Sequence, residues 1–315
     1  MSQQEDIKDV IMIGAGPSAL AAAVYTTRED IDTVLYEKGV IGGLAAITDM
    51  IDNYPGFPDG IDGMTLADQL QKQAERFGAK IVLGDVSEIH NDGDTKTAIV
   101  NGEPVKARAI LIATGSDYNK IGVPGEAEYY GRGVHYCATC DGAFYRERRI
   151  AVVGGGNSGV QEALFLTRFA SHIDLLVRST IKASEVLQTE LQEHINSGKV
   201  TVHLGTTITE IVAVEGKVAR VDILKGGEPA SLDLDGVFIF VGLKPNTGFL
   251  EGSGVELDEQ RLIKTDKNLM TNIPGVFASG DVRSGATMQI ASAVGEGATA
   301  ALNIREYLEG TKTKA

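Results

Sequence analysis

A glycine-rich turn of one kind occurs twice in this chain of 315 residues, each time between an apolar run and a helix-forming run. In the first copy, the apolar run Asp9–Ile13 leads into the turn Gly14–Ala19 and then into the alanine-rich segment Leu20–Thr27. In the second copy, Arg149–Val153 leads into the turn Gly154–Gly159. Two such βαβ units, about 140 residues apart, predict an α/β fold with two Rossmann-like dinucleotide-binding domains.

The two units differ at the end of their second strand. In the first, the expected strand Thr33–Tyr36 is followed by Glu37, whose carboxylate can accept hydrogen bonds from a ribose. In the second, a helix from Val160 to Phe169 and a strand from Ile173 to Val177 are expected. The position equivalent to Glu37 falls on Val177 itself, so no carboxylate stands ready there to bind a 2′-hydroxyl group or to repel a 2′-phosphate.

The two cysteines of the chain lie together as Cys137-Ala-Thr-Cys140. A structural disulfide at this spacing would close a very small loop and stabilise the fold little. A zinc site would need two further ligands, and the five histidines are scattered. A redox dithiol needs only these two sulfur atoms, so we expect redox chemistry and no metal.

Charge and hydropathy narrow the class of partner. The chain has 43 acidic and 29 basic residues, a net charge of −14, which argues against binding nucleic acid or an anionic membrane surface. No apolar run approaches the ~18 residues needed to span a bilayer, and the first residues show no secretory signal. We therefore expect a cytoplasmic protein, in which a free dithiol persists.

Two further segments predict that the first domain is built from both ends of the chain. Lys106–Gly115 reads as a strand ending in Ala-Thr-Gly, and Gly275–Asp281 as a strand ending in Gly-Asp. The segment Gln289–Leu308 reads as a helix that ends near Gly310. If these pieces belong with the first βαβ unit, the second domain is inserted into the first. The expected ranges are 1–117 and 246–315 for the first domain and 118–245 for the second.

With these segments in place, the chain resembles the low-molecular-weight thioredoxin reductases along nearly its full length. The most specific match is the string Cys-Ala-Thr-Cys-Asp-Gly inside the second domain. The matching segments are Gly14–Ala19, Asp52–Phe57, Ala113–Gly115, Cys137–Gly142, Gly154–Ser158, Gly242–Thr247 and Ala278–Asp281.

The resemblance implies a homodimeric flavoenzyme that reduces thioredoxin-like proteins. It implies FAD in the first domain, NADPH in the second, and a rotation between the two domains during turnover. By similarity, Cys140 faces the flavin, Cys137 attacks the partner's disulfide, and Asp141 is the acid–base that protonates the leaving thiolate. Asp is also favoured at helix N-caps, so Asp141 has a structural interpretation as well.

The cofactor contacts implied by this resemblance are assigned residue by residue. For the flavin nucleotide they are Gly14, Gly16, Pro17, Ser18, Ala19, Glu37, Lys38, Gly42, Gly43, Leu44, Asn53, Val86, Ala113, Thr114, Gly115, Gly280, Asp281, Met288, Gln289 and Ile290. For the pyridine nucleotide they are Gly156, Asn157, Ser158, Gly159, Arg178 and Lys182.

Three positions depart from the family pattern. Leu44 stands where the family usually has Gln, so a side-chain hydrogen bond toward the flavin is lost. Met288 stands where an Arg usually precedes Gln289, so a positive charge is lost. The basic pattern that holds the 2′-phosphate is reduced to Arg178 and Lys182, whose structural interpretation is solvated surface charge.

The loss of basic residues from this pattern leaves the identity of the electron donor open. NADPH is the expected donor, bound less tightly than a complete clamp would allow, with NADH as an alternative. Some related flavoproteins have lost pyridine-nucleotide binding and take electrons from ferredoxin, although an acidic surface would slow the encounter with an acidic ferredoxin. A redox sensor would not need both sulfur atoms and the acid. A peroxiredoxin-reducing subunit would carry additional thioredoxin-like domains at its N-terminus.

Overall fold

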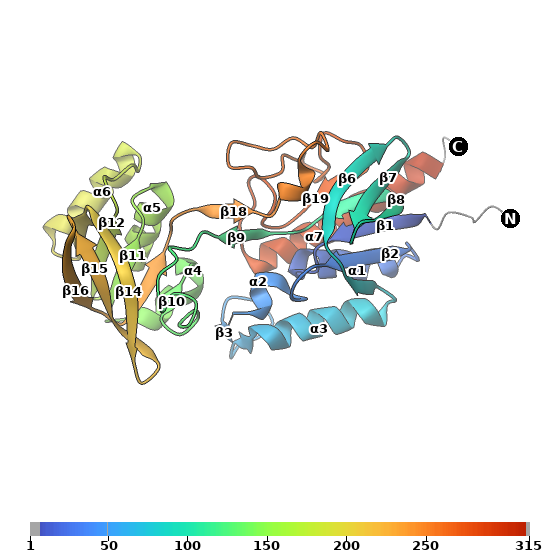
Figure 1. Cartoon of the computed structure of the whole chain (residues 1–315). Helices are drawn as coiled ribbons and strands as arrows, with labels where there is room; N and C mark the ends of the chain where they lie inside the picture. The colour runs from blue at the N-terminus through green and yellow to red at the C-terminus, as the bar shows by residue number, and fades with distance from the viewer. Residues whose placement is uncertain (1–6, 49, 313–315) are drawn as a thin grey trace. The chain divides into compact units, whose positions relative to one another are not determined.

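The computed structural model describes residues 7–48 and 50–312, and the chain divides into two compact units (Figure 1). Unit 1 combines Met1–Asp117 with Lys244–Ala315, and unit 2 is the intervening segment Tyr118–Leu243. The connecting segments form the paired strands β9 (Ser116–Tyr118) and β18 (Leu243–Pro245). The predicted fold class, with two Rossmann-like domains and the second inserted into the first, is confirmed.

The main sheet of unit 1 is built around β1 (Lys8–Ile13), which pairs in parallel with β2 and β8. The strand order is β5-β2-β1-β8-β7-β6, and β19 also pairs with β8. The long β8 has β7 along its first half and β19 along its second half, on the edge away from β1. The bounds are β2 (Thr33–Glu37), β5 (Lys80–Leu83), β6 (Val86–Asp92), β7 (Thr95–Val100), β8 (Glu103–Ile112) and β19 (Val276–Ala278).

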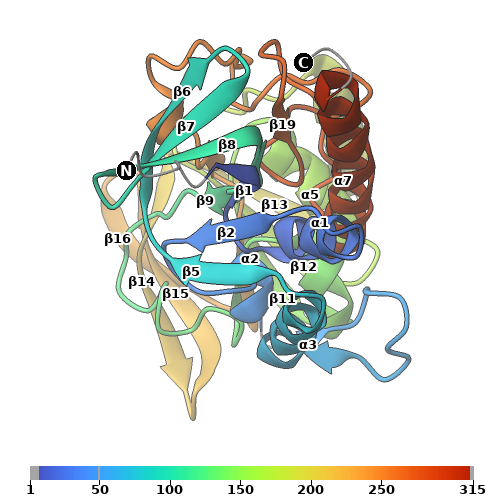
Figure 2. The ribbon, with the colours of Figure 1, turned by 90° about the vertical axis from the view of Figure 1, so that its right-hand side faces the viewer.

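The residues of β1 alternate between two buried layers, as a strand with both faces covered requires. Val10 and Met12 pack in the cluster with α1 (Pro17–Thr27), α3 (Gly63–Arg76) and α7 (Ile290–Lys312). Ile11 and Ile13 pack in the opposite cluster, with side chains of β6 and β7 and of the segment that follows η2 (Gly248–Leu250). Figure 2 shows the three helices along one side of this sheet.

Several expected boundaries are corrected. The last helix continues two residues past Gly310, to Lys312, and Arg108 on β8 donates to Leu308 O and Thr311 Oγ1 in its final turn. The strand β8 begins at Glu103, before Lys106, because its first residues pair with β7 in a hairpin. Within the described ranges, no helix has the length and apolarity needed to cross a membrane.

Short elements complete unit 1 between the second and fifth strands of the chain. These are α2 (Gly43–Ala46), β3 (Met50–Ile51) and β4 (Ile61–Asp62). The carboxylate of Asp62 accepts a hydrogen bond of 2.8 Å from the backbone N–H of Thr65 and so caps α3.

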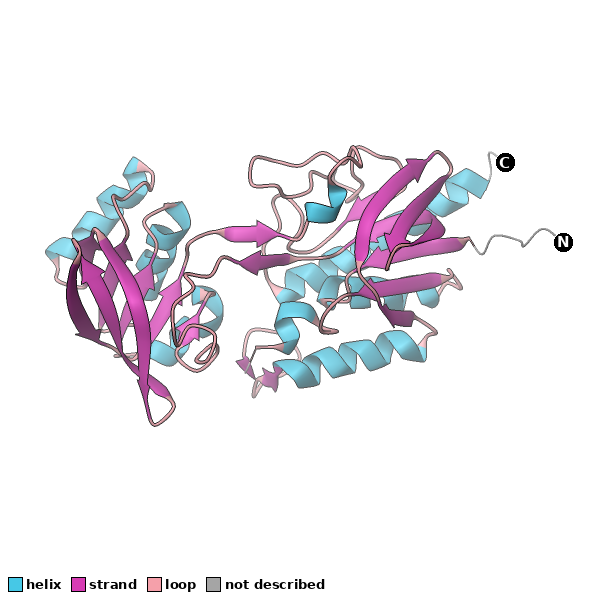
Figure 3. Ribbon diagram, in the orientation of Figure 1, coloured by secondary structure: helices cyan, strands magenta, loops and turns pink. Residues whose placement is uncertain are grey.

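Unit 2 has a parallel sheet covered on one side by helices and on the other by an antiparallel sheet (Figure 3). The parallel order is β10 (Val134–His135), β17 (Gly236–Ile239), β11 (Arg149–Val153), β12 (His172–Val177) and β13 (Val200–Leu204). The covering elements are α5 (Asn157–Leu166), α6 (Glu185–Asn196), β14 (Thr206–Val214), β15 (Lys217–Lys225) and β16 (Glu228–Asp233). The helix α5 lies three residues earlier than expected because it starts directly at the glycine turn.

Candidate active site

The two cysteines form a disulfide at the start of a short helical turn, α4 (Ala138–Asp141). Cys137 is the N-cap of this turn, and the backbone N–H of Cys140 donates to Cys137 Sγ at 3.2 Å. Both cysteines are half-buried, with Cα atoms 5.3 Å apart. A backbone donor aimed at Cys137 Sγ would stabilise negative charge on this sulfur atom when the bond is broken.

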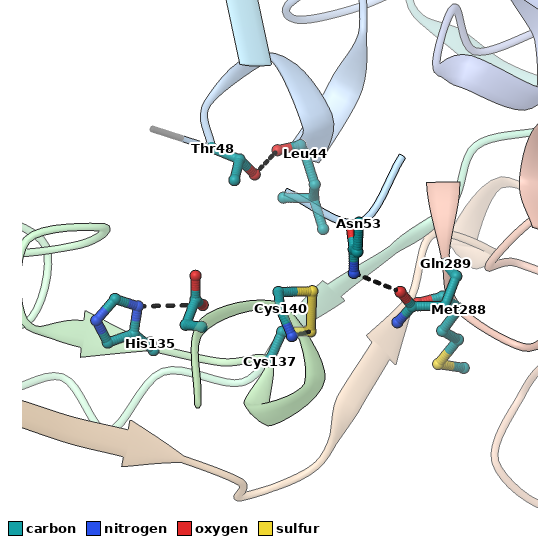
Figure 4. Close-up of a disulfide and its surroundings, with 9 residues drawn as sticks. Leu44, Thr48, Asn53, His135, Cys137, Cys140, Met288 and Gln289 are labelled. Atoms are coloured by element: carbon teal, nitrogen blue, oxygen red, sulfur yellow. Dashed lines mark hydrogen bonds and ion pairs between the residues drawn. A yellow bond between two sulfur atoms is a disulfide. The ribbon is translucent and has the colours of Figure 1, made fainter. Parts of the chain in front are cut away.

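Asp141 directly follows Cys140 and precedes the 3₁₀ turn η1 (Gly142–Tyr145). Its side chain makes no capping hydrogen bond to η1, although the capping interpretation predicted one. Instead, Asp141 Oδ2 lies 3.1 Å from His135 Nδ1 (Figure 4, dashed line at His135). The carboxyl group is mostly buried, with 18% of its side-chain surface exposed.

The first glycine turn has the geometry that the motif predicts. Gly14 has φ +97°, and a Cβ atom there would lie 2.5 Å from Ala113 O. The Cα of Gly16 faces open space directly before Pro17, the first residue of α1. An anionic group can therefore approach the N-terminus of α1 without meeting a side chain.

Glu37 stands at the end of β2, as expected, and its two oxygen atoms have separate partners. Oε2 accepts from the backbone N–H of Ala15 at 2.8 Å, and Oε1 accepts from that of Gly39 at 2.7 Å. These bonds fix the carboxylate beside the glycine turn, where its remaining lone pairs are available to hydroxyl groups.

Two cavities of unit 1, of about 280 and about 410 Å³, share four lining residues, which are Glu37, Lys38, Thr114 and Asn246. The predicted flavin contacts that line the first cavity are Gly16, Pro17, Ser18, Glu37, Lys38, Gly43, Leu44, Ala113, Thr114, Gly115, Gly280, Asp281, Gln289 and Ile290. The second cavity adds Gly14 and Val86. Two adjoining cavities form the elongated space that a dinucleotide needs.

Four predicted contacts do not line either cavity. Ala19, in the first turn of α1, is fully buried in the core. Gly42 serves packing, because a Cβ atom there would lie 2.3 Å from Ala67 Cβ on α3. The other two, Asn53 and Met288, are linked through Gln289: Asn53 Nδ2 donates to Gln289 Oε1 at 3.1 Å, and Gln289 Nε2 donates to Met288 O (Figure 4).

Several lining residues were not predicted. In the first cavity they include Ser116, Asn246 and Ser279, and in the second Tyr36, Lys244 and Phe249. Asn246 bonds Thr114 in both directions, with its Nδ2 donating to Thr114 O and its backbone O accepting from Thr114 Oγ1. Asn246 and Ser279 lie within matched motifs, so those motifs were the signal that could have identified them.

Asp281 has an unusual environment in the first cavity. Burial, and to a lesser degree the charge of Glu296, raise the pKa of its carboxyl group to about 6. Glu296 on α7 accepts from the backbone N–H of Gly280 at 2.8 Å and pairs with Arg283. The Gly-Asp turn is thereby held against α7 at the cavity wall.

Of the three departures, Leu44 has the clearest structural consequence, because its apolar side chain lines the first cavity where the family usually presents an amide. Met288 adopts a left-handed backbone conformation with φ +56°, which is uncommon for a residue other than glycine. Its side chain is not part of either cavity wall.

The second glycine turn repeats the geometry of the first. Gly154 has φ +145°, and a Cβ atom there would lie 2.3 Å from Phe240 O, while one at Gly159 would lie 2.5 Å from Gly154 O. Gly156 faces open space at the start of α5. The exposed Asn157 and Ser158 begin this helix, and Asn157 Oδ1 accepts from the backbone N–H of Ser184.

The two basic residues assigned to the 2′-phosphate lie after β12, on the loop next to this turn. Arg178 and Lys182 are both exposed, and the backbone N–H of Lys182 donates to Gly155 O. Within residues 7–48 and 50–312, no group of three or more His, Cys, Asp or Glu side chains is arranged to hold a metal ion.

Comparisons with known proteins agree with this architecture. Residues 8–297 match the model of the pyridine nucleotide-disulphide oxidoreductase family. The chain is 42% identical to a thioredoxin reductase of Listeria innocua, over 99% of this chain and 97% of that protein. It is 40% identical to a thioredoxin reductase of Bacillus subtilis, over 97% and 96% of the two chains.

Among solved structures, the thioredoxin reductase from Streptococcus pyogenes is similar, with a TM-score of 0.92 and 38% identity. That match covers 98% of this chain and all of the other. Glycine turns, the cysteine pair and full-length similarity therefore point to one conclusion. The chain belongs to the pyridine nucleotide-disulphide oxidoreductase family, and within it to the thioredoxin reductases.

Proposed function

We propose that this protein is an NADPH-dependent thioredoxin reductase that passes two electrons through FAD and the Cys137–Cys140 pair to a thioredoxin-like protein. The observation that carries the proposal is the half-buried Cys137–Cys140 disulfide, followed directly by the carboxyl group of Asp141. A structural cross-link over this short loop would add little stability, whereas an acid in the residue next to Cys140 serves thiol–disulfide exchange.

The walls of the two cavities in unit 1 fit a flavin dinucleotide. The open face of Gly16 and the N-terminus of α1 suit its pyrophosphate, the carboxylate of Glu37 suits a ribose, and Asp281 suits the ribityl chain. When bound, FAD would supply two-electron transfer between a nicotinamide and the disulfide. Leu44 offers that ring system no hydrogen bond from its side chain.

The turn at Gly154–Gly159 fits a second nucleotide in unit 2. The open face of Gly156 suits a pyrophosphate, and Arg178 and Lys182 are the cationic groups available to a 2′-phosphate. The position equivalent to Glu37 is Val177, which is buried and carries no charge. These features favour NADPH over NADH.

The sulfur chemistry then uses the residues of α4. Two electrons break the Cys137–Cys140 bond, and Asp141 protonates one of the thiolates that leave it. The Cys137 thiolate next attacks the partner's disulfide, forming a mixed disulfide and releasing one partner sulfur. Asp141 takes the proton from Cys140, whose thiolate attacks Cys137 and restores the original bond as the second partner sulfur leaves. Two electrons have moved to the partner, and its two leaving thiolates take their protons from solvent.

A protein partner needs a surface beside the dithiol. Phe144, in the η1 turn that follows Asp141, has 53% of its surface exposed, which is unusual for a large aromatic side chain. It could provide apolar contact to a thioredoxin-like protein. The proposal also includes a homodimer and a cytoplasmic location, which size-exclusion chromatography and cell fractionation would test.

The direct test is steady-state reduction of a thioredoxin disulfide by the purified, FAD-loaded protein with NADPH, with NADH as the comparison. We expect turnover with both components present and a lower KM for NADPH than for NADH. Absence of thioredoxin reduction despite bound FAD would contradict the proposal.

A second candidate is a flavin thioredoxin reductase that takes its electrons from ferredoxin instead of a pyridine nucleotide. It is supported by the small number of basic residues assigned to a 2′-phosphate, since these are only Arg178 and Lys182 and both are exposed. Anaerobic titration with NADPH, NADH and reduced ferredoxin distinguishes the two. Flavin bleaching by ferredoxin alone would favour the candidate that does not use a pyridine nucleotide.

A further inference from the structure

A buried histidine lies behind Asp141, at a position to which the mechanism above gives no role. His135, at the end of β10, has only 6% of its surface exposed. Its Nδ1 lies 3.1 Å from Asp141 Oδ2, and its Nε2 lies 2.7 Å from Tyr145 Oη. The three side chains form a continuous series, phenol to imidazole to carboxyl group, that ends at Asp141, the residue directly after Cys140 (Figure 4 shows His135 and the disulfide).

Packing fixes the orientation of the imidazole ring. Phe238 stacks on it with ring centroids 5.1 Å apart and 28° between the planes, and Tyr145 meets it edge-on. Tyr145 is itself confined, because a Cβ atom on Gly236 of the neighbouring strand β17 would lie 2.3 Å from its ring. The ring of His135 therefore has no room to turn its nitrogen atoms away from their two partners.

The partners also determine which nitrogen faces Asp141 as a donor. Burial, followed by the charges of Asp141 and Asp235, raises the pKa of Tyr145, so its phenol keeps its proton. When His135 is neutral, the phenol can donate to Nε2, which leaves the ring proton on Nδ1. When His135 is charged, both nitrogen atoms carry protons. In either state Nδ1–H donates to Asp141 Oδ2.

We propose that His135 is a positioning residue for Asp141, with Tyr145 holding the imidazole in place. The Nδ1–H group engages one carboxyl oxygen and leaves the other for the sulfur atoms of the Cys137–Cys140 pair. His135 forms no bond to substrate and transfers no electron. The inference rests on the proposed acid–base role of Asp141.

The test compares variants that separate the ring from its nitrogen atoms. His135→Phe keeps an aromatic ring against Phe238 and removes both nitrogens, whereas His135→Asn places an amide nitrogen near the position of Nδ1. Both are made in the wild-type and the Asp141→Asn backgrounds. Steady-state kcat and KM for thioredoxin are measured with NADPH on FAD-loaded protein, and thermal unfolding checks that each variant is folded.

In the wild-type background, His135→Phe should lower kcat about tenfold with KM unchanged, the effect of one lost charge-assisted hydrogen bond. His135→Asn should recover most of that loss. In the Asp141→Asn background, His135→Phe should have no further effect, because the group that it positions is already gone. If His135→Phe does not fold, Tyr145→Phe should give a smaller fall in kcat, about threefold, in the same direction.

Three results would overturn this inference and leave the proposed function standing. They are an unchanged kcat in the histidine variants, a kcat of His135→Asn as low as that of His135→Phe, or an equal fall in kcat when His135→Phe is made in the Asp141→Asn background. Wild-type turnover in Asp141→Asn alone would instead remove the proposed acid–base role, and the inference with it.

Discussion

At the scale of single residues, Arg178 carries most of the expected preference for NADPH. It is exposed and follows the buried Val177 at the end of β12. Arg178→Ala should raise the KM for NADPH about tenfold, the lower end for loss of a charge-assisted contact, because the exposed guanidinium is also hydrated. The KM for NADH should stay as it is in the wild type, and this serves as the control. An unchanged KM for NADPH would remove the phosphate assignment.

Glu37 should matter for flavin retention. Its carboxylate lines both cavities of unit 1 and is fixed by two backbone donors. Glu37→Ala should weaken FAD binding by about tenfold, because an acceptor for ribose hydroxyls is lost. Equilibrium dialysis of FAD against the wild type and the variant measures this change. Equal affinities would show that the carboxylate does not contact the nucleotide.

Asp281 should make stability depend on pH. Its carboxyl pKa is raised from 3.8 to about 6 by burial and by Glu296, so the folded state favours the neutral form. The contribution of the Asp281 carboxyl group to the free energy of unfolding is complete below about pH 4 and is lost as the pH rises through about 6. Asp281→Asn is neutral at every pH. Between about pH 4 and 7 its free energy of unfolding should therefore rise relative to that of the wild type, by up to roughly 3 kcal/mol.

The measurement is the free energy of urea unfolding of FAD-free protein at several pH values in that range. The difference between Asp281→Asn and the wild type should grow with pH. A difference that does not vary with pH would contradict the raised pKa.

At the scale of elements, the contact between α1 and α7 depends on one glycine. A Cβ atom at Gly297 would lie 2.1 Å from Ser18 O, so the two helices approach through their backbones. Gly297→Ala should destabilise the protein by about 3 kcal/mol, because both helices pack on the same face of the sheet and line the first cavity, so neither backbone can move freely.

Gly295 provides the matched control in the same helix. It is exposed, and a Cβ atom there would meet nothing within 4 Å. Gly295→Ala should leave stability unchanged or raise it by up to ~1 kcal/mol through helix propensity. Equal unfolding midpoints for the two alanine variants would show that α7 tolerates a side chain against Ser18.

The elements that the sequence predicted best are those with a local signal. Each glycine turn lies within a single βαβ unit, a span of roughly 30 residues, and in the first unit the acid Glu37 follows the turn. The structure has both turns and Glu37 as expected. The last turn of α7 extends two residues past Gly310, where it is held by Arg108, about 200 residues earlier in the chain. The low helix propensity of Gly310 gave no indication of this contact.

At the scale of the whole molecule, the candidate sites join segments that are far apart in sequence. Thr114 bonds Asn246, and Ser18 bonds Ser279 through their hydroxyl groups at 2.6 Å. The sequence indicated which motifs belong together but not which side chains complete each cavity wall. The series from Tyr145 through His135 to Asp141 was missed for a similar reason, since it depends on how β10 packs beside η1.

The two-unit organisation assigns separate tasks to the two parts of the chain. Unit 1 holds both cavities with the Glu37 and Asp281 carboxyl groups, and unit 2 holds the disulfide and the second glycine turn. Loss of a single sulfur atom in unit 2 should therefore stop disulfide reduction and leave the flavin of unit 1 reducible by its donor. This separation is the central consequence of the proposed electron path.

The measurement that tests it most directly compares the wild type with Cys137→Ser, both loaded with FAD, under anaerobic conditions. We expect NADPH to bleach the flavin of both proteins, and only the wild type to go on to reduce a thioredoxin disulfide. Cys140 remains in the variant, so the change removes only the sulfur that is proposed to attack the partner and keeps the one that is proposed to face the flavin. Reduction of thioredoxin by Cys137→Ser at the wild-type rate would contradict the account, and so would a wild-type flavin that NADPH does not reduce.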